Sequence, residues 1–269
     1  MKYTAPKWLS QAAMNTLPID ITVVGLGGTG SELVSRLFKM HYLLKKLGGA
    51  GFNVTLIDDD TVTAANVGRQ SFFEFDIGMA KAEVLARRFN SFSDTQWKYA
   101  KTRLNKNNFV QLIQSQSILL TCVDNPYTRC EIGEFLENRN AQIVWIDGGN
   151  DANTAQVVMG TSESRNDIDF SRLPNVFDLY GEQLKTQEFK DSDSCSHEAA
   201  ISKQDFGIND TVAQVMSQLV WQLIRYGQVE SHGAIIDMAN FKQSPLPIQP
   251  DVWAMFGFDI KGKTELNYE

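Results

Sequence analysis

The stretch Ile21-Thr22-Val23-Val24-Gly25-Leu26-Gly27-Gly28-Thr29-Gly30-Ser31-Glu32-Leu33 combines an apolar strand, a glycine turn and the start of a helix. Gly25, Gly27 and Gly30 occupy the fixed positions of G-x-G-x-x-G, and Gly28 is a fourth glycine inside the turn. One glycine allows the tight turn, one lets a phosphate approach the backbone, and one lets the helix pack close to the strand. The helix would direct free N–H groups and its positive dipole end at an anion. The stretch predicts a nucleotide site; a glycine turn without a ligand is the alternative.

Composition limits the class of protein. The 269 residues suffice for one large α/β domain or two small ones, and a hydrophobic content of 43% supports a core. A net charge of −7 argues against nucleic acid as the main partner, because phosphate backbones bind clustered Lys and Arg. No window reaches the roughly 18 apolar residues of a membrane span, and the N-terminus lacks the apolar run of a signal peptide. We therefore expect a cytoplasmic protein that does not bind membranes.

The glycine turn lies in a β-α-β unit. Residues 1–17 are expected to form an irregular or helical arm, and the first strand covers 20–24. A helix from Gly30 carries leucines at helical spacing until Gly48-Gly49-Ala50-Gly51 ends it. Residues 53–57 form the second strand. A parallel sheet follows, since the two strands are joined by a helix.

Acidic residues follow the second strand. Asp58 takes the position at which a ribose hydroxyl is usually held, and Asp60 is a further candidate. The alternative is that residues 58–60 are only a solvated strand end. The polar loop that comes next contains Asn66, Arg69 and Gln70.

Lys81 is expected in the first turn of a helix that begins near Ile77 and is capped by Asp76. A lysine there opposes the helix dipole by about a few tenths of a kcal/mol, which suggests that it faces an anion. Arg69 and Lys81 would then both reach toward the phosphates of a triphosphate. Two ordinary surface cations are the alternative.

A third strand is predicted from Gln116 to Val123. Because ligands bind at the carboxyl ends of parallel strands, Asp124 would lie beside the glycine turn and could hold Mg²⁺. Asn125 and Pro126 start the next helix, which carries Arg129, and a further strand spans 143–149.

The last part of the chain divides less clearly. Residues 150–205 are polar and are expected to be rich in loops. A helix over 207–226 has a broad apolar face, with Asn209 or Asp210 as its cap, and 232–238 is expected to be a late antiparallel strand. The aromatic tail contains Trp253, Phe256 and Phe258, which could dock on the domain or hold a partner.

Four separated motifs occur in an order that resembles the ThiF/MoeB superfamily, whose enzymes adenylate ubiquitin-like and sulfur-carrier proteins. They are Gly25-x-Gly27-Gly28-x-Gly30, Asp58-x-Asp60-x-Val62-x-x-x-Asn66-x-x-Arg69-Gln70, Gly78-x-x-Lys81 and Cys122-x-Asp124-Asn125-x-x-x-Arg129. The resemblance covers residues 20 to about 160. The C-terminal part is similar to the ThiF-family protein of PRTRC systems. The similarity runs from Ser194-Cys195-Ser196-x-x-Ala199 through Gln204-x-Phe206-x-Ile208-Asn209 to His232-Gly233 and Pro245-Leu246-Pro247-Ile248. Those bacterial gene clusters also encode ubiquitin-like and conjugating-enzyme-like proteins.

This resemblance implies a fold and a domain plan. The fold is α/β, with a Rossmann-like, mostly parallel sheet, helices on both faces and late antiparallel strands. Residues 1–17 would be an N-terminal arm and 18–269 a single adenylation domain. That domain would comprise a nucleotide-binding half (18–150), a crossover-type loop region (150–205) and a C-terminal helix, strands and tail (206–269).

The resemblance also implies a reaction. ATP and the C-terminal glycine of a ubiquitin-like carrier would give an acyl-adenylate and pyrophosphate, followed by transfer to a cysteine or to a conjugating-enzyme-like protein. Arg69 and Lys81 would stabilise charge on the phosphates, and Mg²⁺ on Asp124 would neutralise the pyrophosphate. Relatives are usually homodimers. The implied ATP-binding residues are Gly25, Gly27, Gly28, Gly30, Asp58, Asp60, Asn66, Arg69, Gln70, Lys81, Val123, Asp124, Asn125 and Arg129.

The sequence departs from the superfamily in two respects. Most relatives hold a structural zinc with two C-x-x-C pairs, whereas the cysteines here are Cys122, Cys130 and Cys195, so no such zinc is expected. Bacterial relatives lend an N-terminal arginine to a partner subunit, but residues 1–35 contain no arginine.

Cys195 is the cysteine placed to accept the carrier as a thioester. Its acidic neighbours Asp191, Asp193 and Glu198 disfavour the thiolate, whereas His197 could favour it, so a structural thiol is the alternative. Two other functions remain: a nucleotide-binding scaffold without activity that docks a ubiquitin-like protein, and an NAD- or FAD-dependent oxidoreductase. The oxidoreductase leaves Arg69, Lys81 and Asp124 unexplained.

Overall fold

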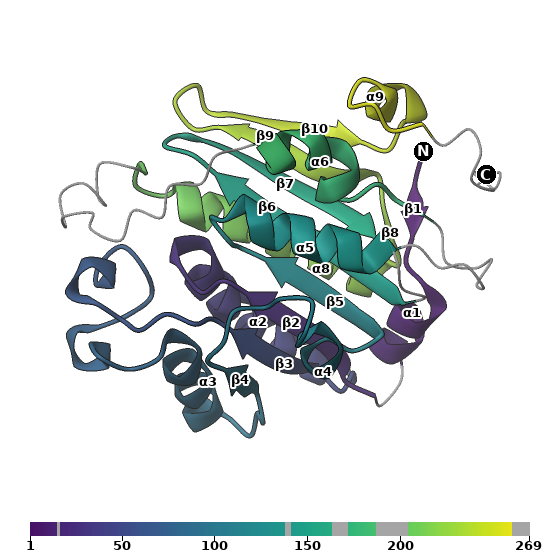
Figure 1. Ribbon diagram of the computed structural model, residues 1–269. Coiled ribbons are helices and arrows are strands. Elements are labelled where there is room, and N and C mark those ends of the chain that lie inside the picture. Colours follow the sequence, from purple (N-terminus) through teal and green to yellow (C-terminus); the bar gives the residue numbers. More distant parts are fainter. Residues whose placement is uncertain (15–16, 138–140, 163–171, 187–203, 260–269) are drawn as a thin grey trace.

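A computed structural model describes residues 1–14, 17–137, 141–162, 172–186 and 204–259 (Figure 1). Its main element is an eight-stranded sheet with the strand order β10-β9-β7-β6-β5-β2-β3-β4, and β1 pairs with β8 in a separate two-stranded sheet. The strands are β1 Tyr3–Thr4, β2 Ile19–Val24, β3 Phe52–Ile57, β4 Lys98–Ala100, β5 Gln116–Thr121, β6 Gln142–Asn150, β7 Thr154–Thr161, β8 Gln228–Val229, β9 Ser231–Asp237 and β10 Lys242–Pro247.

Helices lie on both faces of this sheet. Figure 1 shows α5 and α6 on one face and α2 and α8 on the other. The helices are α1 Lys7–Met14, α2 Gly28–Lys46, α3 Lys81–Phe92, α4 Phe109–Leu112, α5 Pro126–Glu137, α6 Val176–Thr186, α8 Ile208–Tyr226 and α9 Pro250–Ala254, with 3₁₀ turns η1 Ala64–Asn66 and η2 Glu74–Asp76. The predicted α/β class, with a mostly parallel sheet and late antiparallel strands, is confirmed.

The parallel half of the sheet consists of β6, β5, β2, β3 and β4. Its strands β2, β3, β5 and β6 are mostly buried and largely apolar because helices cover both faces of the sheet. Gln116–Thr121 is the fourth strand of this half in chain order, so the predicted third strand is wrong in rank. The short strand β4 was missed, because three residues with exposed or half-exposed side chains give no periodic signal.

The antiparallel half consists of β7, β9 and β10, paired in that order from β6 outward. The prediction that residues 150–205 are mainly loop is wrong for two segments, since 154–161 is β7 and 176–186 is α6. The apolar end of β7 is buried against the core, which overrides its polar start.

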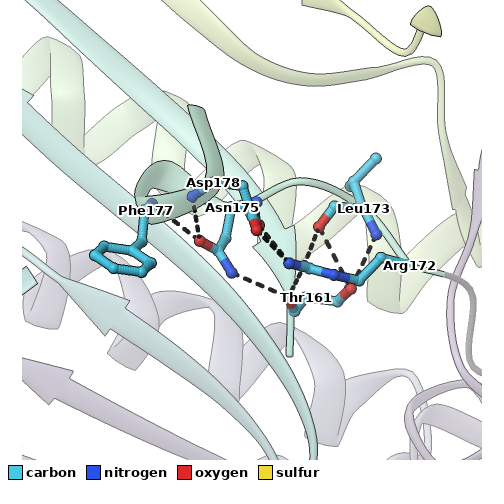
Figure 2. A network of polar contacts seen from close by, with 6 residues as sticks. All are labelled: Thr161, Arg172, Leu173, Asn175, Phe177 and Asp178. Carbon is cyan, nitrogen blue, oxygen red and sulfur yellow. Dashed lines mark hydrogen bonds and ion pairs between the residues drawn. The ribbon is translucent and has the colours of Figure 1, made fainter. Parts of the chain in front are cut away.

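Figure 2 shows the polar network that connects β7 to α6. Asn175 Oδ1 accepts hydrogen bonds from the backbone N–H groups of Phe177 and Asp178, at 2.9 and 3.1 Å, and so caps the helix. Arg172 binds both carboxylate oxygens of Asp178 at 2.5 Å and also donates to the carbonyl oxygen of Thr161. These contacts tie the first turn of α6 to the end of β7.

Both ends of the described chain pack on the domain. The arm residues Tyr3 and Thr4 pair with β8 near the C-terminus of α8, so the arm lies away from the N-terminus of that helix. In the tail, Trp253 is fully buried, and its Nε1–H donates to His232 Nε2 at 2.9 Å. The sequence left open whether the aromatic tail docks on the domain or holds a partner, and the structure shows Trp253 packed on the domain.

The predicted start of the helix near Ile77 is wrong. Asp76 ends the 3₁₀ turn η2, where its Oδ2 accepts the backbone N–H of Phe73 at 2.8 Å, and it also pairs with Arg88. The α-helix begins only at Lys81. Among the described residues, no helix is both long and apolar enough to cross a membrane.

Candidate nucleotide and acyl site

A pocket of about 1010 Å³ runs along the carboxyl ends of the parallel strands. Its wall begins at the loop after β4, with Thr102 to Leu104, and passes the ends of β3, β2, β5 and β6. It continues onto β7 and β9, where Gln156 and Ile235 line it. The position agrees with the rule that ligands of open α/β sheets bind beyond the carboxyl ends of the strands.

The structure brings together all of the predicted ATP-binding residues except Gly30. Gly30 lies behind the turn, where a β-carbon would be 1.9 Å from the carbonyl oxygen of Gly25. Gly25 itself has a φ of +83°, which residues with a side chain disfavour. The backbone therefore requires glycine at both positions, for close approach at Gly30 and for the positive φ at Gly25. The predicted ATP-binding residues that line the pocket are Gly25, Gly27, Gly28, Asp58, Asp60, Asn66, Arg69, Gln70, Lys81, Val123, Asp124, Asn125 and Arg129.

Asp58 joins the glycine turn to the loop after β3. Its Oδ2 accepts the backbone N–H of Leu26 at 2.5 Å, and its Oδ1 accepts the backbone N–H of Asp60 at 2.8 Å. Burial raises the pKa of the Asp58 carboxyl above its usual value, and the nearby Lys81 charge opposes that shift. Each oxygen retains a lone pair in the pocket, so a ribose hydroxyl could still donate to this carboxylate.

Lys81 is held at the same place by the next acid. Its Nζ lies 2.7 Å from Asp60 Oδ2, and its backbone N–H donates to the Asp60 carbonyl oxygen at 3.1 Å. The lysine side chain is 6% exposed, whereas that of Asp60 is 66% exposed. A buried lysine at a helix start is therefore neutralised by one exposed carboxylate, which phosphate oxygens could replace.

The polar loop contributes two unpartnered atoms. Arg69 Nε and Gln70 Oε1 are buried and have no hydrogen-bond partner among the described residues. Asn66 has its Oδ1 engaged by the backbone N–H of Thr63, at 2.9 Å, and so it shapes the 3₁₀ turn η1. An unpaired donor and acceptor in the pocket wall fit a polar ligand, because buried polar atoms are normally paired.

Asp124 and Asn125 follow β5 in different environments. Asp124 is exposed in the pocket, and Asn125 is buried, with its Oδ1 accepting the backbone N–H of Tyr127 at 2.8 Å. Asp124 is thus an accessible oxygen ligand of the kind that Mg²⁺ uses. Separately, oxygen atoms of Asp58, Asp59 and Asp60 lie within 4.8 Å of one another.

Arg129 is buried and ion-paired. Its Nε lies 2.9 Å from both carboxylate oxygens of Asp147, and its Nη2 donates to the Gly148 carbonyl oxygen at 3.3 Å. Asp147 also accepts the hydroxyl of Thr121 at 2.5 Å, and that hydroxyl accepts the indole N–H of Trp145 at 2.8 Å. Arg129 therefore forms part of the pocket floor with its charge already compensated.

Several pocket residues were not predicted as site residues. Arg103, Asn150 and Gln156 belong to no motif, and the sequence gives no local signal for them. Gln204 belongs to the C-terminal pattern Gln204-x-Phe206-x-Ile208-Asn209, but that pattern assigned it no role in the site. Asn209 was predicted as a helix cap, and this is wrong: Gly207 is the N-cap, and neither Asn209 nor Asp210 bonds to the helix end. Asn209 instead lines the pocket.

The cysteines differ in position. Cys122 is half-buried at the pocket, and burial raises the pKa of its thiol strongly, followed in effect by the Asp147 carboxylate. Cys130 is also half-buried. The predicted thioester residue Cys195 lies outside the described residues.

A sequence model of the ThiF family matches residues 10–226 of this chain. The matched range includes the glycine turn, the pocket acids and the helix α8, and it contains every predicted site residue.

Curated relatives match over shorter stretches. The chain is 29% identical over 116 residues to the adenylyltransferase and sulfurtransferase UBA4 of Yarrowia lipolytica, which covers 42% of this chain and 27% of UBA4. It is 40% identical over 82 residues to the NEDD8-activating enzyme E1 catalytic subunit of Dictyostelium discoideum, which covers 29% of this chain and 16% of that protein. The matches thus span about a quarter or less of the relatives' own length.

Solved structures share the fold at low sequence identity. E. coli MccB with ATP has a TM-score of 0.57 and 18% identity, with 90% of this chain and 66% of MccB covered. PaaA has a TM-score of 0.61 and 14% identity, with 90% and 67% covered. Both therefore carry the same arrangement of sheet and helices over most of this chain.

Proposed function

The chain belongs to the ThiF family, and from this we propose that it uses ATP to adenylate the C-terminal glycine of a ubiquitin-like or sulfur-carrier protein. One observation carries the proposal. A single pocket contains the glycine turn, Asp58, Arg69, Lys81 and Asp124, and then continues beyond them onto β7 and β9. A nucleotide site alone would not need that extension.

The first part of the pocket fits ATP. Helix α2 begins at Gly28 and directs its positive end at the pocket, where it would stabilise phosphate oxygens. Arg69 and Gln70 line the pocket, and Arg69 Nε and Gln70 Oε1 lack partners, so a rotation of either side chain toward a nucleotide would break no hydrogen bond of these atoms. Asp58 lies at the end of β3, where it would accept a ribose hydroxyl.

These residues support adenyl transfer by electrostatics and positioning. The carrier carboxylate is already ionised and attacks the α-phosphorus, so no general base is required. Arg69 and Lys81 would stabilise the charge that develops on the phosphate oxygens, with Lys81 exchanging Asp60 for phosphate. Mg²⁺ held by Asp124 would supply charge neutralisation for the pyrophosphate.

The second part of the pocket would hold the end of the carrier. From β6 to β9 the wall crosses two strand spacings, or about 10 Å, which accommodates about three residues of extended chain. Gly149, Gln156 and Ile235 lie along this stretch. At the start of this stretch the Arg129 guanidinium already lies close to Gly149, because a β-carbon on Gly149 would be only 3.3 Å from Arg129 Nη2. Little space remains there for a side chain of the carrier, which favours a terminal glycine.

The relatives motivate the choice of substrate. UBA4 is an adenylyltransferase and sulfurtransferase, and the second relative is a NEDD8-activating enzyme subunit. We include a later transfer to Cys195 or to a conjugating-enzyme-like protein, a PRTRC gene context and a homodimer in the proposal on the strength of the family resemblance. A scaffold that binds a ubiquitin-like protein without turnover is the second candidate, because the described arm supplies no arginine.

The test is ATP–pyrophosphate exchange. Each ubiquitin-like protein of the source genome that ends in glycine would be added with Mg²⁺, and wild type would be compared with Asp124→Ala. Asp251→Ala is the control, because it removes an exposed aspartate on α9 outside the pocket. Exchange that only Asp124→Ala abolishes supports adenylation. ATP and carrier binding without exchange would instead support the scaffold.

A further inference from the structure

Four polar side chains meet where the glycine turn faces the end of β6. Asn209 Oδ1 accepts a hydrogen bond from Thr29 Oγ1 at 2.9 Å and another from Asn150 Nδ2 at 3.1 Å. Asn209 Nδ2 donates to Gln204 Oε1 at 3.0 Å. All four side chains line the pocket. We name Thr29, Asn150, Gln204 and Asn209 the amide cluster.

The amide cluster depends on Gly28. A β-carbon on Gly28 would lie 2.5 Å from the carboxamide of Asn209, so only glycine lets the first turn of α8 approach the first turn of α2 this closely. The positive ends of two helix dipoles therefore converge on the cluster. Gly28 thus has a structural reason that is independent of any phosphate.

A donor count shows what the amide cluster can still bind. A carboxamide has two N–H donors and one oxygen acceptor with two lone pairs. Asn209 uses both lone pairs and one N–H within the cluster, and Asn150 uses one N–H. One N–H on each residue therefore remains for a ligand in the pocket.

Resting on the adenylation proposed above, we propose that Asn150 binds the terminal glycine of the carrier and that Asn209 is the positioning residue that orients Asn150. Asn150 stands at the end of β6, between the glycine turn and the stretch that would hold the carrier. Its remaining N–H would donate to the glycine carboxylate as the new oxygen–phosphorus bond forms and the bond from the α-phosphorus to pyrophosphate breaks. No proton moves in this step.

Neutral donors suit this position. A lysine or arginine would hold the carboxylate as an ion pair and reduce its nucleophilicity, whereas an amide N–H orients it at lower cost. The two converging helix ends offset the repulsion between the carboxylate and the α-phosphate. Thr29 and Gln204 restrict Asn209, so the carboxamide of Asn150 keeps one orientation.

The inference can be tested without knowing the carrier. The probe is diglycyl sulfamoyl adenosine, in which a sulfamate replaces the acyl phosphate, and AMP is the reference ligand. Dissociation constants of both would be measured by calorimetry for wild type, Asn150→Ala, Asn150→Asp and Asn209→Ala. Asn153→Ala is the matched control, because this asparagine on the same β6–β7 hairpin lies outside the pocket lining.

We expect wild type to bind the probe at least about tenfold more tightly than AMP. Asn150→Ala should lose about tenfold in probe affinity, which corresponds to the loss of one hydrogen bond to a polar ligand. Asn150→Asp should lose more, since it removes both donors while keeping the size. Asn209→Ala should lose less, and the double variant Asn150→Ala/Asn209→Ala should equal Asn150→Ala alone, because the second residue acts through the first. AMP affinity should change less than about twofold throughout.

Three results would contradict the inference. If all variants keep the wild-type preference for the probe, Asn150 does not hold the acyl group, and the proposed adenylation is unaffected. If probe and AMP weaken by the same factor, the amide cluster supports only the nucleotide. If wild type binds ATP but has no preference for the probe over AMP and shows no pyrophosphate exchange, both the proposed function and this inference are wrong.

Discussion

The parallel and antiparallel halves of the sheet contribute to the pocket in different ways. The ends of β2, β3 and β5 supply the glycine turn, Asp58 and Asp124, all of which belong to motifs. The antiparallel strands β7 and β9 supply Gln156 and Ile235, which belong to none. Charged groups and hydrogen-bond donors without a partner are concentrated in the parallel half, whereas the antiparallel half mainly determines the shape of the pocket. The difference suggests that motif residues act on the nucleotide, while the other wall selects the acyl partner.

The strand shared by the two halves should give the largest effect on stability. Asp147 on β6 pairs with buried Arg129 and is 1% exposed, so Asp147→Ala would leave a buried guanidinium without its counter-charge. Loss of one member of such a pair costs about 3–5 kcal/mol. Urea unfolding would measure this change. The exposed pair Lys45–Asp94 is the control, since Asp94→Ala should barely change the free energy of unfolding. If Asp147→Ala and Asp94→Ala lower the free energy of unfolding equally, the buried ion pair is no more important for stability than the exposed one.

Lys81 tests whether the parallel half carries the chemistry. Lys81→Met keeps most of the buried stem and removes the charge, and its partner Asp60 stays solvated, so the fold should persist. The exchange rate constant should fall by about 10²–10³, as for other electrostatic groups at a reacting centre. Gln156→Ala should instead raise the KM for the carrier by about tenfold and leave kcat nearly unchanged. The division between the halves fails if both variants lower kcat alike.

The antiparallel half should set the acid limit of stability. His232 accepts the indole N–H of Trp253 and contacts the Met159 carbonyl oxygen, and burial lowers its pKa to about 4 from 6.5. The folded state thus favours neutral histidine, so this stabilisation is complete above pH 6.5 and is lost as the pH falls toward 4. Wild type should lose about 3 kcal/mol more than His232→Gln over that range.

Urea unfolding at several pH values between 7.5 and 4 would measure this difference in the free energy of unfolding. His41, whose pKa burial also lowers, remains in both proteins, so its effect cancels in the comparison. If the free energy of unfolding changes with pH in the same way in wild type and in His232→Gln, protonation of His232 does not cause the loss of stability in acid.

The sequence predicted the parallel half well for physical reasons. The strands before Gly25 and Asp58 are apolar runs that end in turn or acidic residues, and α8 has one broad apolar face, so local patterns match the final burial. It missed β4, which is too short for a pattern, and β7 and α6, whose burial depends on distant partners.

Asn209 shows why part of the site could not be predicted. Its position after Gly207 is typical of a helix cap, but Gly207 takes that role with a φ of +89°. The side chain bonds instead to Thr29, which is 180 residues away in the chain. The pairing of Arg129 with Asp147 likewise joins separate elements. Contacts of this kind depend on the assembled sheet and leave no local signal.

Substitution of Asp60 tests whether this residue contacts the nucleotide directly or acts only through Lys81. We expect this substitution to have the smallest effect of those considered. The sequence resemblance places Asp60 among the ATP-binding residues, whereas the structure pairs it with Lys81 at 2.7 Å. Asp60→Asn removes the charge and keeps an acceptor for Lys81. Asp59→Asn makes the same change of charge at the adjacent exposed residue, so it measures the general electrostatic effect.

If Asp60 only neutralises Lys81 until phosphate arrives, the two variants should bind ATP with affinities within about threefold of each other. A loss of about tenfold or more that is confined to Asp60→Asn would mean that this carboxylate contacts the nucleotide or its metal ion itself. In that event Lys81 would keep Asp60 as a partner when the nucleotide is bound, and the proposed exchange of Asp60 for phosphate would be wrong.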